Sequence, residues 1–204
     1  MNPPRKARVA VLVSGGGTNL QAILNAAGRG DLPHAEIALV ISNKAGAYAL
    51  ERAAQAGVPA LTVTRKDCGS QAAFEAAILA ALEDNKIDLI VLAGFLAILS
   101  EDFTARYPRR ILNVHPSLIP SFCGAGFYGL KVHEAALARG VKVTGATVHF
   151  VNEIPDGCAI IAQKAVAVLD TDTPETLQKR VMEEAEWILL PAAVEQVAAE
   201  LLSR

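Results

Sequence analysis

The sequence of 204 residues has few aromatic residues, a single tryptophan and only three cysteines. Cys68, Cys123 and Cys158 are far apart, and no C-x-x-C pair is present. The spacing excludes a zinc ribbon and a thioredoxin-type redox pair. Unpaired, widely separated cysteines are typical of proteins in a reducing compartment. We therefore expect a cytoplasmic location.

The chain also lacks an excess of charge of either sign. The 19 Lys and Arg residues stand against 21 Asp and Glu residues, for a formal net charge of -2. A nucleic-acid-binding protein normally carries a basic face or stripe. The composition therefore predicts that nucleic acid is not a partner.

Long hydrophobic runs are missing as well. The apolar stretch Val9–Val13 ends at a run of glycines and is too short for a signal-peptide core or a membrane span. No internal repeat, low-complexity stretch or linker divides the chain. We predict one domain, residues 1–204, that does not cross a membrane.

Short apolar runs alternate with helical periodicity in the first half of the chain. Strands are predicted at 9–13, 37–41, 60–63 and 88–92, and helices at about 20–27, 47–56 and 71–85. This alternation requires a mostly parallel sheet with helices on both faces. The predicted fold class is α/β, a three-layer twisted sheet with a Rossmann-like N-terminal half.

The second half continues the sheet and ends in a long helix. Strands are predicted at 111–114, 145–151 and 159–168, with a helix at about 133–139. Thr173 is expected to cap the last helix and Pro174 to occupy its first turn. The apolar stripe around Trp187, Ile188 and Leu190 is interpreted as core.

The loop Ser14–Asn19 reads Ser-Gly-Gly-Gly-Thr-Asn and joins a strand to a helix. Its glycines let backbone N–H groups approach an anion, and the helix N-terminus adds positive partial charge. It is neither a Walker A loop nor a G-x-G-x-x-G loop, since no Gly-Lys-Ser/Thr follows and residue 20 is Leu. The loop predicts phosphate binding, with Thr18 and Asn19 as further donors. A tight turn capped by Thr18 or Asn19 is the alternative.

Asn113 and His115 form a polar pair at the end of a predicted strand. Alternation places both on one face, and ligands gather at the carboxyl ends of strands in open α/β sheets. An amide can stabilise an oxyanion and an imidazole can relay a proton, so the pair suits acyl or formyl transfer to nitrogen. A strand-end His bonded to backbone is the alternative for His115. Asp156 can orient an imidazole and favour its charged form, although Asp-Gly is also a common turn.

The other histidines are interpreted without a catalytic role. His133 begins an incomplete H-E-x-x-H motif, since residue 137 is Leu, and no zinc site is predicted. His149 is interpreted as a packed strand residue, and His34 as a solvated loop residue.

Five motifs occur in order along the chain: Ser14–Asn19, Leu92–Phe95 with Ile98–Ser100, Asn113–Leu118, Gly145–Phe150 and Asp156–Gly157. Through them the chain, from Val9 to about Val194, resembles the folate-dependent phosphoribosylglycinamide formyltransferases. The resemblance implies formyl transfer from the co-substrate 10-formyltetrahydrofolate to the amine of 5'-phosphoribosylglycinamide in de novo purine biosynthesis. It further implies direct attack without a covalent enzyme intermediate, no metal, small-molecule substrates, and a monomer or homodimer.

The resemblance also implies roles for individual residues. Residues 1–95 would form the half that binds the phosphate substrate, and residues 96–204 the half that binds folate and carries catalysis. The catalytic residues would be Asn113, His115 and Asp156. The substrate would be bound by Gly15, Gly16, Gly17, Thr18, Asn19 and Glu186. Folate would be bound by Gln71, Leu96, Ala97, Ile98, Leu99, Asn113, Asn152, Glu153, Ile154, Pro155 and Asp156.

Three positions depart from the commoner family pattern. Ala97 stands where an Arg is often found, which leaves backbone or apolar contact to folate, and Gln71 stands about where an Arg can reach it. The segment 121–128 is longer than the expected short loop. A mobile lid and a surface insertion are both open interpretations of this segment.

Other functions are compatible with parts of the pattern. A formyltetrahydrofolate hydrolase or a methionyl-tRNA formyltransferase usually carries a further domain, for which we expect no room in this chain. A non-catalytic phosphosugar-binding module would keep the glycine loop and make Asn113 and His115 structural. A dehydrogenase is disfavoured because G-x-G-x-x-G is missing.

Overall fold

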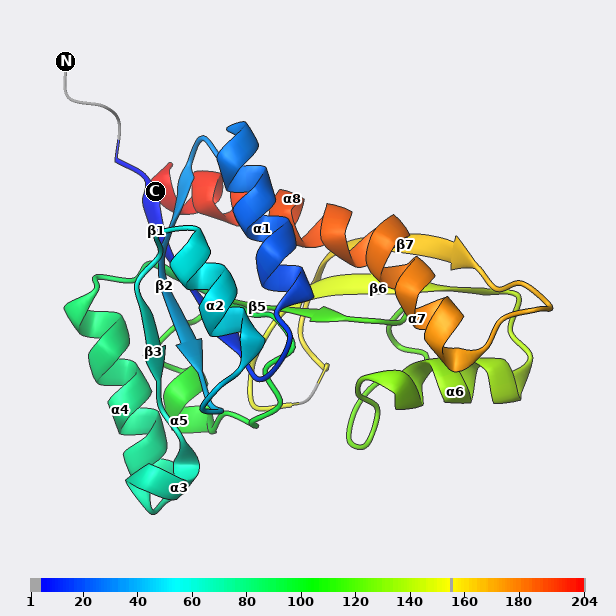
Figure 1. Cartoon of the computed structure of the whole chain (residues 1–204), viewed down its shortest axis with the longest axis horizontal. Coiled ribbons are helices and arrows are strands. Elements are labelled where there is room, and N and C mark those ends of the chain that lie inside the picture. Colours follow the sequence, from blue (N-terminus) through cyan, green and yellow to red (C-terminus); the bar gives the residue numbers. More distant parts are fainter. Residues whose placement is uncertain (1–4, 155, 204) are drawn as a thin grey trace.

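The fold is built on a seven-stranded sheet with strand order β3-β2-β1-β4-β5-β6-β7 (Figure 1). The computed structural model describes residues 5–154 and 156–203. The first five strands in this order, β3, β2, β1, β4 and β5, run parallel to one another, whereas β6 is antiparallel to both β5 and β7. The α/β fold with a mostly parallel sheet is thereby confirmed. The strands are β1 (Ala7–Val13), β2 (Ala35–Ser42), β3 (Ala60–Thr62), β4 (Leu89–Leu92), β5 (Ile111–His115), β6 (Val143–Phe150) and β7 (Ile160–Ala167).

Helices cover both faces of this sheet. In Figure 1, α1 and α8 lie together, while α4 and α5 lie at the other side of the parallel strands. A π-helical turn, Met182–Glu186, joins α7 to α8. The helices are α1 (Thr18–Arg29), α2 (Tyr48–Gln55), α3 (Arg65–Cys68), α4 (Gln71–Asp84), α5 (Glu101–Thr104), α6 (Leu130–Arg139), α7 (Pro174–Val181) and α8 (Trp187–Leu202).

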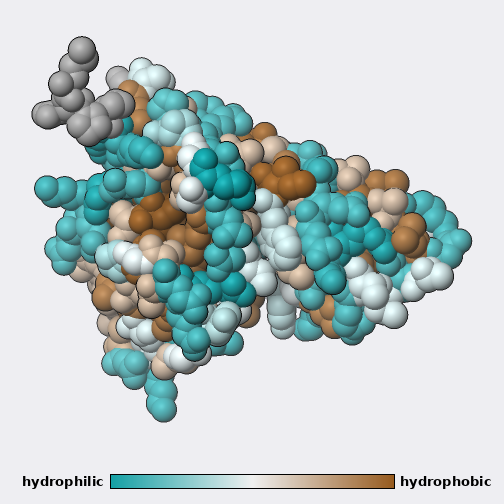
Figure 2. Space-filling model, turned by 45° about the horizontal axis from the view of Figure 1, so that its top comes forward, coloured by the Kyte–Doolittle hydropathy of each residue, from teal (hydrophilic) through white to brown (hydrophobic). Residues whose placement is uncertain are grey.

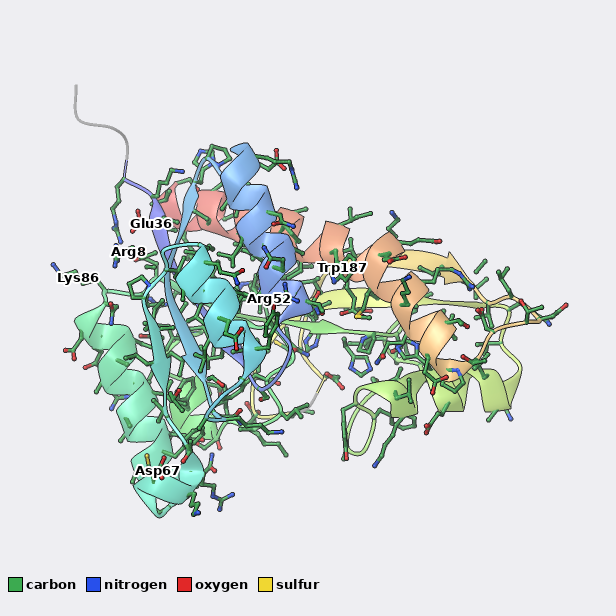
Figure 3. All side chains as sticks on the ribbon, in the orientation of Figure 1. Arg8, Glu36, Arg52, Asp67, Lys86 and Trp187 are labelled. Atoms are coloured by element: carbon green, nitrogen blue, oxygen red, sulfur yellow. The ribbon has the colours of Figure 1, made fainter. Side chains whose placement is uncertain are left out.

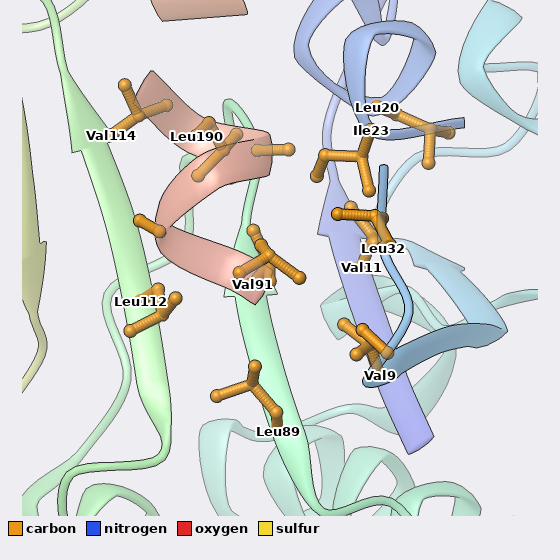
Figure 4. Packing of buried hydrophobic residues seen from close by; sticks show 14 of the residues in the cluster. Val9, Val11, Leu20, Ile23, Leu32, Leu89, Val91, Leu112, Val114 and Leu190 are labelled. Carbon is orange, nitrogen blue, oxygen red and sulfur yellow. The ribbon is translucent and has the colours of Figure 1, made fainter. Parts of the chain in front are cut away.

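Alternate residues of the central strands enter two apolar clusters on opposite faces of the sheet. Val9 and Val11 of β1 belong to the cluster that includes Leu190 of α8 (Figure 4). Leu12 belongs to the other cluster, together with Phe74 of α4. Since β1 faces helices on both sides, its unbroken apolar run is what a doubly buried strand requires. The structure therefore has the three predicted layers.

A third apolar cluster lies over β6 and β7. Ala146 and Val166 from these strands pack with Ala136 of α6 and Leu177 of α7. In Figure 1 these elements extend to the right of the parallel strands and lengthen the molecule. The antiparallel strands thus carry their own helical cover.

Polar side chains dominate the face of the molecule shown in Figure 2, with smaller apolar areas among them. Within the described part of the chain, each helix is either too short or too polar to span a membrane.

Most predicted boundaries lie close to the observed ones, but several features differ. The helices α3 and α5 have four residues each and are too short to show helical periodicity. The last helix begins at Pro174 with the predicted Thr173 cap, but the π-helical turn interrupts it. The expectation of core for the stripe around Trp187 is correct for Leu190 and wrong for Ile188, which is 51% exposed.

Candidate active site

The carboxyl ends of β1, β4 and β5 meet at one edge of the sheet, since these strands are parallel neighbours. The glycine loop follows β1, the segment that contains Leu96 follows β4, and β5 ends at His115. The Ser14 hydroxyl accepts a hydrogen bond from the Leu96 N–H at 2.9 Å, which ties the first two segments together. This edge is where an open α/β sheet binds ligands.

The glycine loop presents unpaired donors at the beginning of α1. Within the described chain, the N–H groups of residues 15–19 have no hydrogen-bond acceptor. Gly17 occupies the N-cap position in a left-handed conformation and supplies no side-chain cap. The side-chain cap by Thr18 or Asn19 that the alternative interpretation expected is therefore wrong. Free N–H groups at a helix N-terminus form an anion site.

The three glycines of this loop meet different surroundings. Gly17 has a φ of 70°, and a Cβ there would lie 2.6 Å from the Cβ of Ala49. Glycine is therefore required at position 17 by the fold itself. A Cβ on Gly15 or Gly16 would meet nothing within 4 Å. Packing therefore does not demand glycine at these two positions.

Asn19 and Glu186 form a buried pair next to the loop. The Asn19 amide Nδ2 donates to the Glu186 carboxyl Oε2 at 2.7 Å, so this amide faces Glu186 and not the loop. Glu186 is 5% exposed and ends the π-helical turn. Burial raises the pKa of the Glu186 carboxyl to about 7, although the hydrogen bond from Asn19 opposes this shift. The structure thus brings together the two residues that were predicted from distant parts of the sequence.

Asp156 lies between two imidazoles at the end of β5. Its Oδ2 is 3.6 Å from Nδ1 of His115, and its Oδ1 is 3.4 Å from Nε2 of His149. The Asn113 amide Nδ2 lies 3.2 Å from the same Nε2 of His149. The predicted trio of Asn113, His115 and Asp156 is therefore one cluster, and His149 belongs to it.

The carboxylate of Asp156 is held in its charged form. Burial opposes the charge, but hydrogen bonds from His149 and the Gly124 N–H, with the charges of His115 and His149, hold the pKa of this carboxyl below its ordinary value. Asp156 also has a φ of 55°, which non-glycine residues rarely adopt. Such a conformation persists where the surrounding contacts dictate it.

His149 is the residue that the sequence interpretation missed. It was expected to be a packed strand residue, and it is indeed only 2% exposed. However, the antiparallel register of β5 and β6 pairs Asn113 directly with His149. Its Nδ1 donates to the Phe150 carbonyl at 2.7 Å, so its Nε2 is left to face Asn113 and Asp156. The direction and register of β6 were needed to find it.

The segment 121–128 covers the cluster. The Phe122 carbonyl accepts a hydrogen bond from Nε2 of His115 at 2.9 Å, and the Gly124 N–H donates to Oδ2 of Asp156 at 2.8 Å. The segment therefore contacts two of the three predicted catalytic residues. Both ring nitrogens of His115 face acceptors, a carbonyl and a carboxylate, and a protonated imidazole serves both.

Two adjoining cavities lie beside this cluster. One of about 560 Å³ is lined by Asn43, Arg65, Gln71, Phe74 and residues 96–100. The other, of about 120 Å³, shares residues 97–99 with the first. The smaller cavity is further lined by Leu92, Phe95, Asn113, His149, Val151, Asn152, Glu153, Ile154 and Asp156.

Most of the predicted folate residues therefore line these two cavities, and Pro155 lies outside the described residues. Gln71 donates to the Glu75 carboxylate at 2.6 Å and to the Ile98 carbonyl at 3.1 Å. Asn43 and Arg65 were not predicted. Asn43 follows β2 directly, and this position at the carboxyl end of a strand was the available signal.

His133 is buried close to this region without taking part in it. It is 0% exposed, and neither ring nitrogen has a hydrogen-bond partner among residues 5–154 and 156–203. Burial, and to a lesser degree the charge of His115, lowers the pKa of His133 to about 4. Across all the described residues, no three His, Cys, Asp or Glu side chains are placed to hold a metal ion.

Comparison with known proteins identifies close relatives. The formyl transferase family matches residues 7–194. The chain is 43% identical over 187 residues to the phosphoribosylglycinamide formyltransferase of Haemophilus influenzae, covering 92% of this chain and 85% of that protein. The crystal structure of phosphoribosylglycinamide formyltransferase from Brucella melitensis is 47% identical, with a TM-score of 0.87 over 96% of this chain and 97% of that one.

A second kind of relative is much longer. The trifunctional purine biosynthetic protein adenosine-3 of Gallus gallus is 48% identical over 194 residues, which cover 95% of this chain and 19% of that protein. The chain thus spans about a fifth of the length of the trifunctional relatives that it matches.

Proposed function

Because the chain belongs to the formyl transferase family, we propose that it transfers a formyl group from 10-formyltetrahydrofolate to the amine of 5'-phosphoribosylglycinamide, in de novo purine biosynthesis. The observation that carries this proposal is the cluster of Asn113, His115 and Asp156 at the edge of a cavity. The relatives named for this activity match almost the whole chain.

The glycine loop would bind the phosphate of the ribonucleotide. Its free N–H groups and the beginning of α1 supply positive potential. The open space at Gly15 and Gly16 leaves room for an anion against the backbone. Thr18 would add its hydroxyl, while Asn19 would hold Glu186, whose carboxyl can accept hydrogen bonds from ribose hydroxyls.

In catalysis the cluster would stabilise a negative charge and transfer a proton. The substrate amine attacks the formyl carbon, and the resulting tetrahedral carbon bears an oxyanion. The Asn113 amide and protonated His115 would stabilise that oxyanion. The bond from carbon to the folate nitrogen then breaks, and the proton lost by the amine reaches that nitrogen through His115 or a water molecule. The nucleophile belongs to the substrate, so no covalent enzyme intermediate is required.

Asp156 and His149 would hold the catalytic side chains in position. Charged Asp156 faces Nδ1 of His115 and fixes the plane of its ring. His149 contacts both Asn113 and Asp156. It therefore restrains the amide and the carboxylate at the same time. In the observed arrangement the Phe122 carbonyl occupies Nε2 of His115, so this contact would open as the co-substrate binds.

The folate would occupy the two cavities. Leu96 and Ile98 are 57% and 75% exposed, and such apolar side chains at a cavity suit the flat pterin and benzoyl rings. Arg65 brings a positive charge to the larger cavity, which suits the carboxylates of the glutamate tail. Ala97 adds only apolar and backbone contact. The residues present therefore fit this co-substrate.

The two halves of the chain would have different roles in binding and catalysis. Residues 1–95 would supply the phosphate loop, and residues 96–204 would supply catalysis and most of the folate contacts. Gln71 and Glu186 would each act in the site built mainly by the other half. We also propose a cytoplasmic enzyme with small-molecule substrates, in accord with its free cysteines, and acting as a monomer or homodimer.

The test is an assay of formyl transfer by the purified protein. The protein is mixed with 10-formyl-5,8-dideazafolate and glycinamide ribonucleotide, and release of the deformylated folate is followed by absorbance. Release that requires the ribonucleotide, and that is lost in His115→Ala, is the expected result.

Two other outcomes would contradict the proposal in different ways. Release of the deformylated folate without the ribonucleotide would identify a formyltetrahydrofolate hydrolase. Binding of both ligands without release would identify a non-catalytic phosphosugar-binding module.

A further inference from the structure

Helix α2 holds two consecutive carbonyl groups of the glycine loop. The Ala49 N–H, in the first turn of α2, donates to the Gly15 carbonyl at 3.1 Å. One turn later, Nε of Arg52 donates to the Gly16 carbonyl at 2.8 Å. Figure 3 shows Arg52 on α2 beside the beginning of α1. The loop is therefore fixed from one side by a helix that contributes nothing to the catalytic cluster.

These two bonds also orient the N–H groups that follow. The C=O of one residue and the N–H of the next belong to one planar trans peptide and point in opposite directions. Holding the Gly15 and Gly16 carbonyls towards α2 therefore turns the Gly16 and Gly17 N–H groups away from α2. Those N–H groups have no acceptor within the described residues. The loop thus has a bonded side and a free side.

The side chain of Arg52 is itself held in one place. Its Nη1 donates to Oε1 of Gln21 in α1 at 2.9 Å. Its guanidinium lies over the Tyr48 ring, 4.9 Å from the ring centroid. Two hydrogen bonds and a stacking contact use the planar fork of Arg in a way that a Lys ammonium cannot reproduce. Arg52 therefore bridges α1, α2 and the loop.

We propose that Arg52 is a positioning residue for recognition of the substrate phosphate. It holds the Gly16 peptide so that the Gly17 N–H points at the phosphate, and its charge adds to the positive potential behind the loop. The proposal rests on the proposed function, because it takes the glycine loop as the phosphate site. It adds a residue that does not touch the substrate and acts through the backbone.

The test compares a phosphorylated and an unphosphorylated substrate in the same enzyme preparations. Wild type, Arg52→Gln and Arg52→Lys are assayed with glycinamide ribonucleotide and with the corresponding riboside. For the ribonucleotide, Arg52→Gln is expected to raise KM about 10- to 100-fold, the range for a lost charge-assisted hydrogen bond, with kcat within about threefold. For the riboside, kcat/KM is expected to be the same in the variant and in wild type.

Arg52→Lys separates positioning from charge. Lys keeps the charge but cannot bond the Gly16 carbonyl and Gln21 together, so most of the increase in KM should remain. Full recovery of KM in Arg52→Lys would reduce the role to charge alone and overturn the positioning proposal. An equal loss of kcat/KM for both substrates in Arg52→Gln would also overturn it, since that pattern indicates general damage to the fold.

Arg106→Gln is the matched control. Arg106 is exposed and pairs with Glu83 of α4 at 3.4 Å, on the sheet face opposite to α2, and its removal should leave both substrates unaffected. Failure of the proposed function has its own signature in wild type. If wild-type kcat/KM is equal for the ribonucleotide and the riboside, then the loop is not a phosphate site. If wild type discriminates and Arg52→Gln retains that discrimination in full, only the role of Arg52 is wrong.

Discussion

At the scale of single residues, the site depends on where charge is buried. Asp156 is charged between two imidazoles, whereas the buried Glu186 carboxyl binds a proton more readily than a solvated one. The difference follows from their partners. Asp156 accepts from the Gly124 N–H and faces His115 and His149, while Glu186 accepts a single amide hydrogen bond from Asn19.

The pKa of Glu186 predicts a change of stability with pH. It is raised to about 7 in the folded protein, so the stability contributed by the neutral carboxyl is fully present below about pH 4.5 and is lost as the pH rises through 7. Glu186→Gln removes this titration. Its free energy of unfolding, relative to wild type, should increase by about 2.5 kcal/mol between pH 5 and pH 8.

Urea unfolding at the two pH values measures this difference. Glu184→Gln is the matched control, because Glu184 is an exposed neighbour and its replacement should show no such pH dependence. A difference in free energy of unfolding between Glu186→Gln and wild type that is the same at pH 5 and pH 8 would contradict the predicted titration.

Sequence patterns identified some of these residues and could not identify others. Asn113 and His115 were predicted because side chains alternate along a strand and polar ones at its carboxyl end indicate a site. The role of Asp156 needed the resemblance, since no spacing shows that it reaches His115. His149 was missed because its neighbours are set by the antiparallel register of β5 and β6. Arg65 lay in a short helix with no periodic signal.

At the scale of the element, the three glycines of the loop have different surroundings. One packs against α2, and the other two border open space. The position of the loop between β1 and α1 was predictable from an apolar run, three glycines and a helical pattern. Its contacts with α2 were not, because they join residues that are 34 and 36 positions apart. The conformation of Gly17 serves packing against Ala49. The open sites at Gly15 and Gly16 would serve the ligand.

This division predicts opposite effects for two neighbouring substitutions. Gly17→Ala should lower the free energy of unfolding by about 2 kcal/mol, because of its positive φ and the clash with Ala49. Gly16→Ala should leave stability within about 0.5 kcal/mol, since its new methyl group meets open space. Gly16→Ala should instead raise KM for glycinamide ribonucleotide by about tenfold or more, because the methyl group competes with the phosphate.

Urea unfolding and steady-state kinetics on both variants measure these effects. Gly15→Ala serves as a second substitution into open space and should also fold normally. Equal stability of Gly16→Ala and Gly17→Ala would contradict the distinction drawn from their surroundings.

At the scale of the whole molecule, the fold separates a parallel half from an antiparallel extension. Alternating strands and helices predicted the parallel half well, since each strand there is a short apolar run. The direction of β6 and β7 was not predictable, because alternation within a strand is the same in either direction. Helix α6 of the extension holds His133, which is fully buried with no hydrogen-bond partner in the described chain.

His133 predicts acid sensitivity of the folded protein. Its pKa is about 4 in the fold and about 6.5 in an unfolded chain. As the pH falls from 6.5 to 4, the unfolded chain therefore takes up a proton that the native state excludes, and stability falls by up to about 3 kcal/mol. His133→Leu should remove this contribution. The free energy of unfolding of the variant should therefore rise relative to that of wild type as the pH falls from 7.5 to 4.5.

Urea unfolding at pH 7.5 and 4.5 measures the change. His34→Gln is the comparison: His34 is exposed and contacts the Glu195 carboxylate, so its loss should not remove the acid sensitivity that burial of His133 produces. If the difference in free energy of unfolding between His133→Leu and wild type does not vary with pH, the imidazole is not excluded from protonation in the fold.

Asn113 and His115 are proposed to act as one unit on the formyl group. The most direct test is the single-turnover rate of formyl transfer from 10-formyl-5,8-dideazafolate to glycinamide ribonucleotide, with both ligands saturating. Asn113→Ala and His115→Ala should each lose about 10²–10⁴-fold in this rate. The double variant should lose little more than the worse single one, as residues of one catalytic unit do. A wild-type rate in either single variant, with the ribonucleotide still required, would contradict the account.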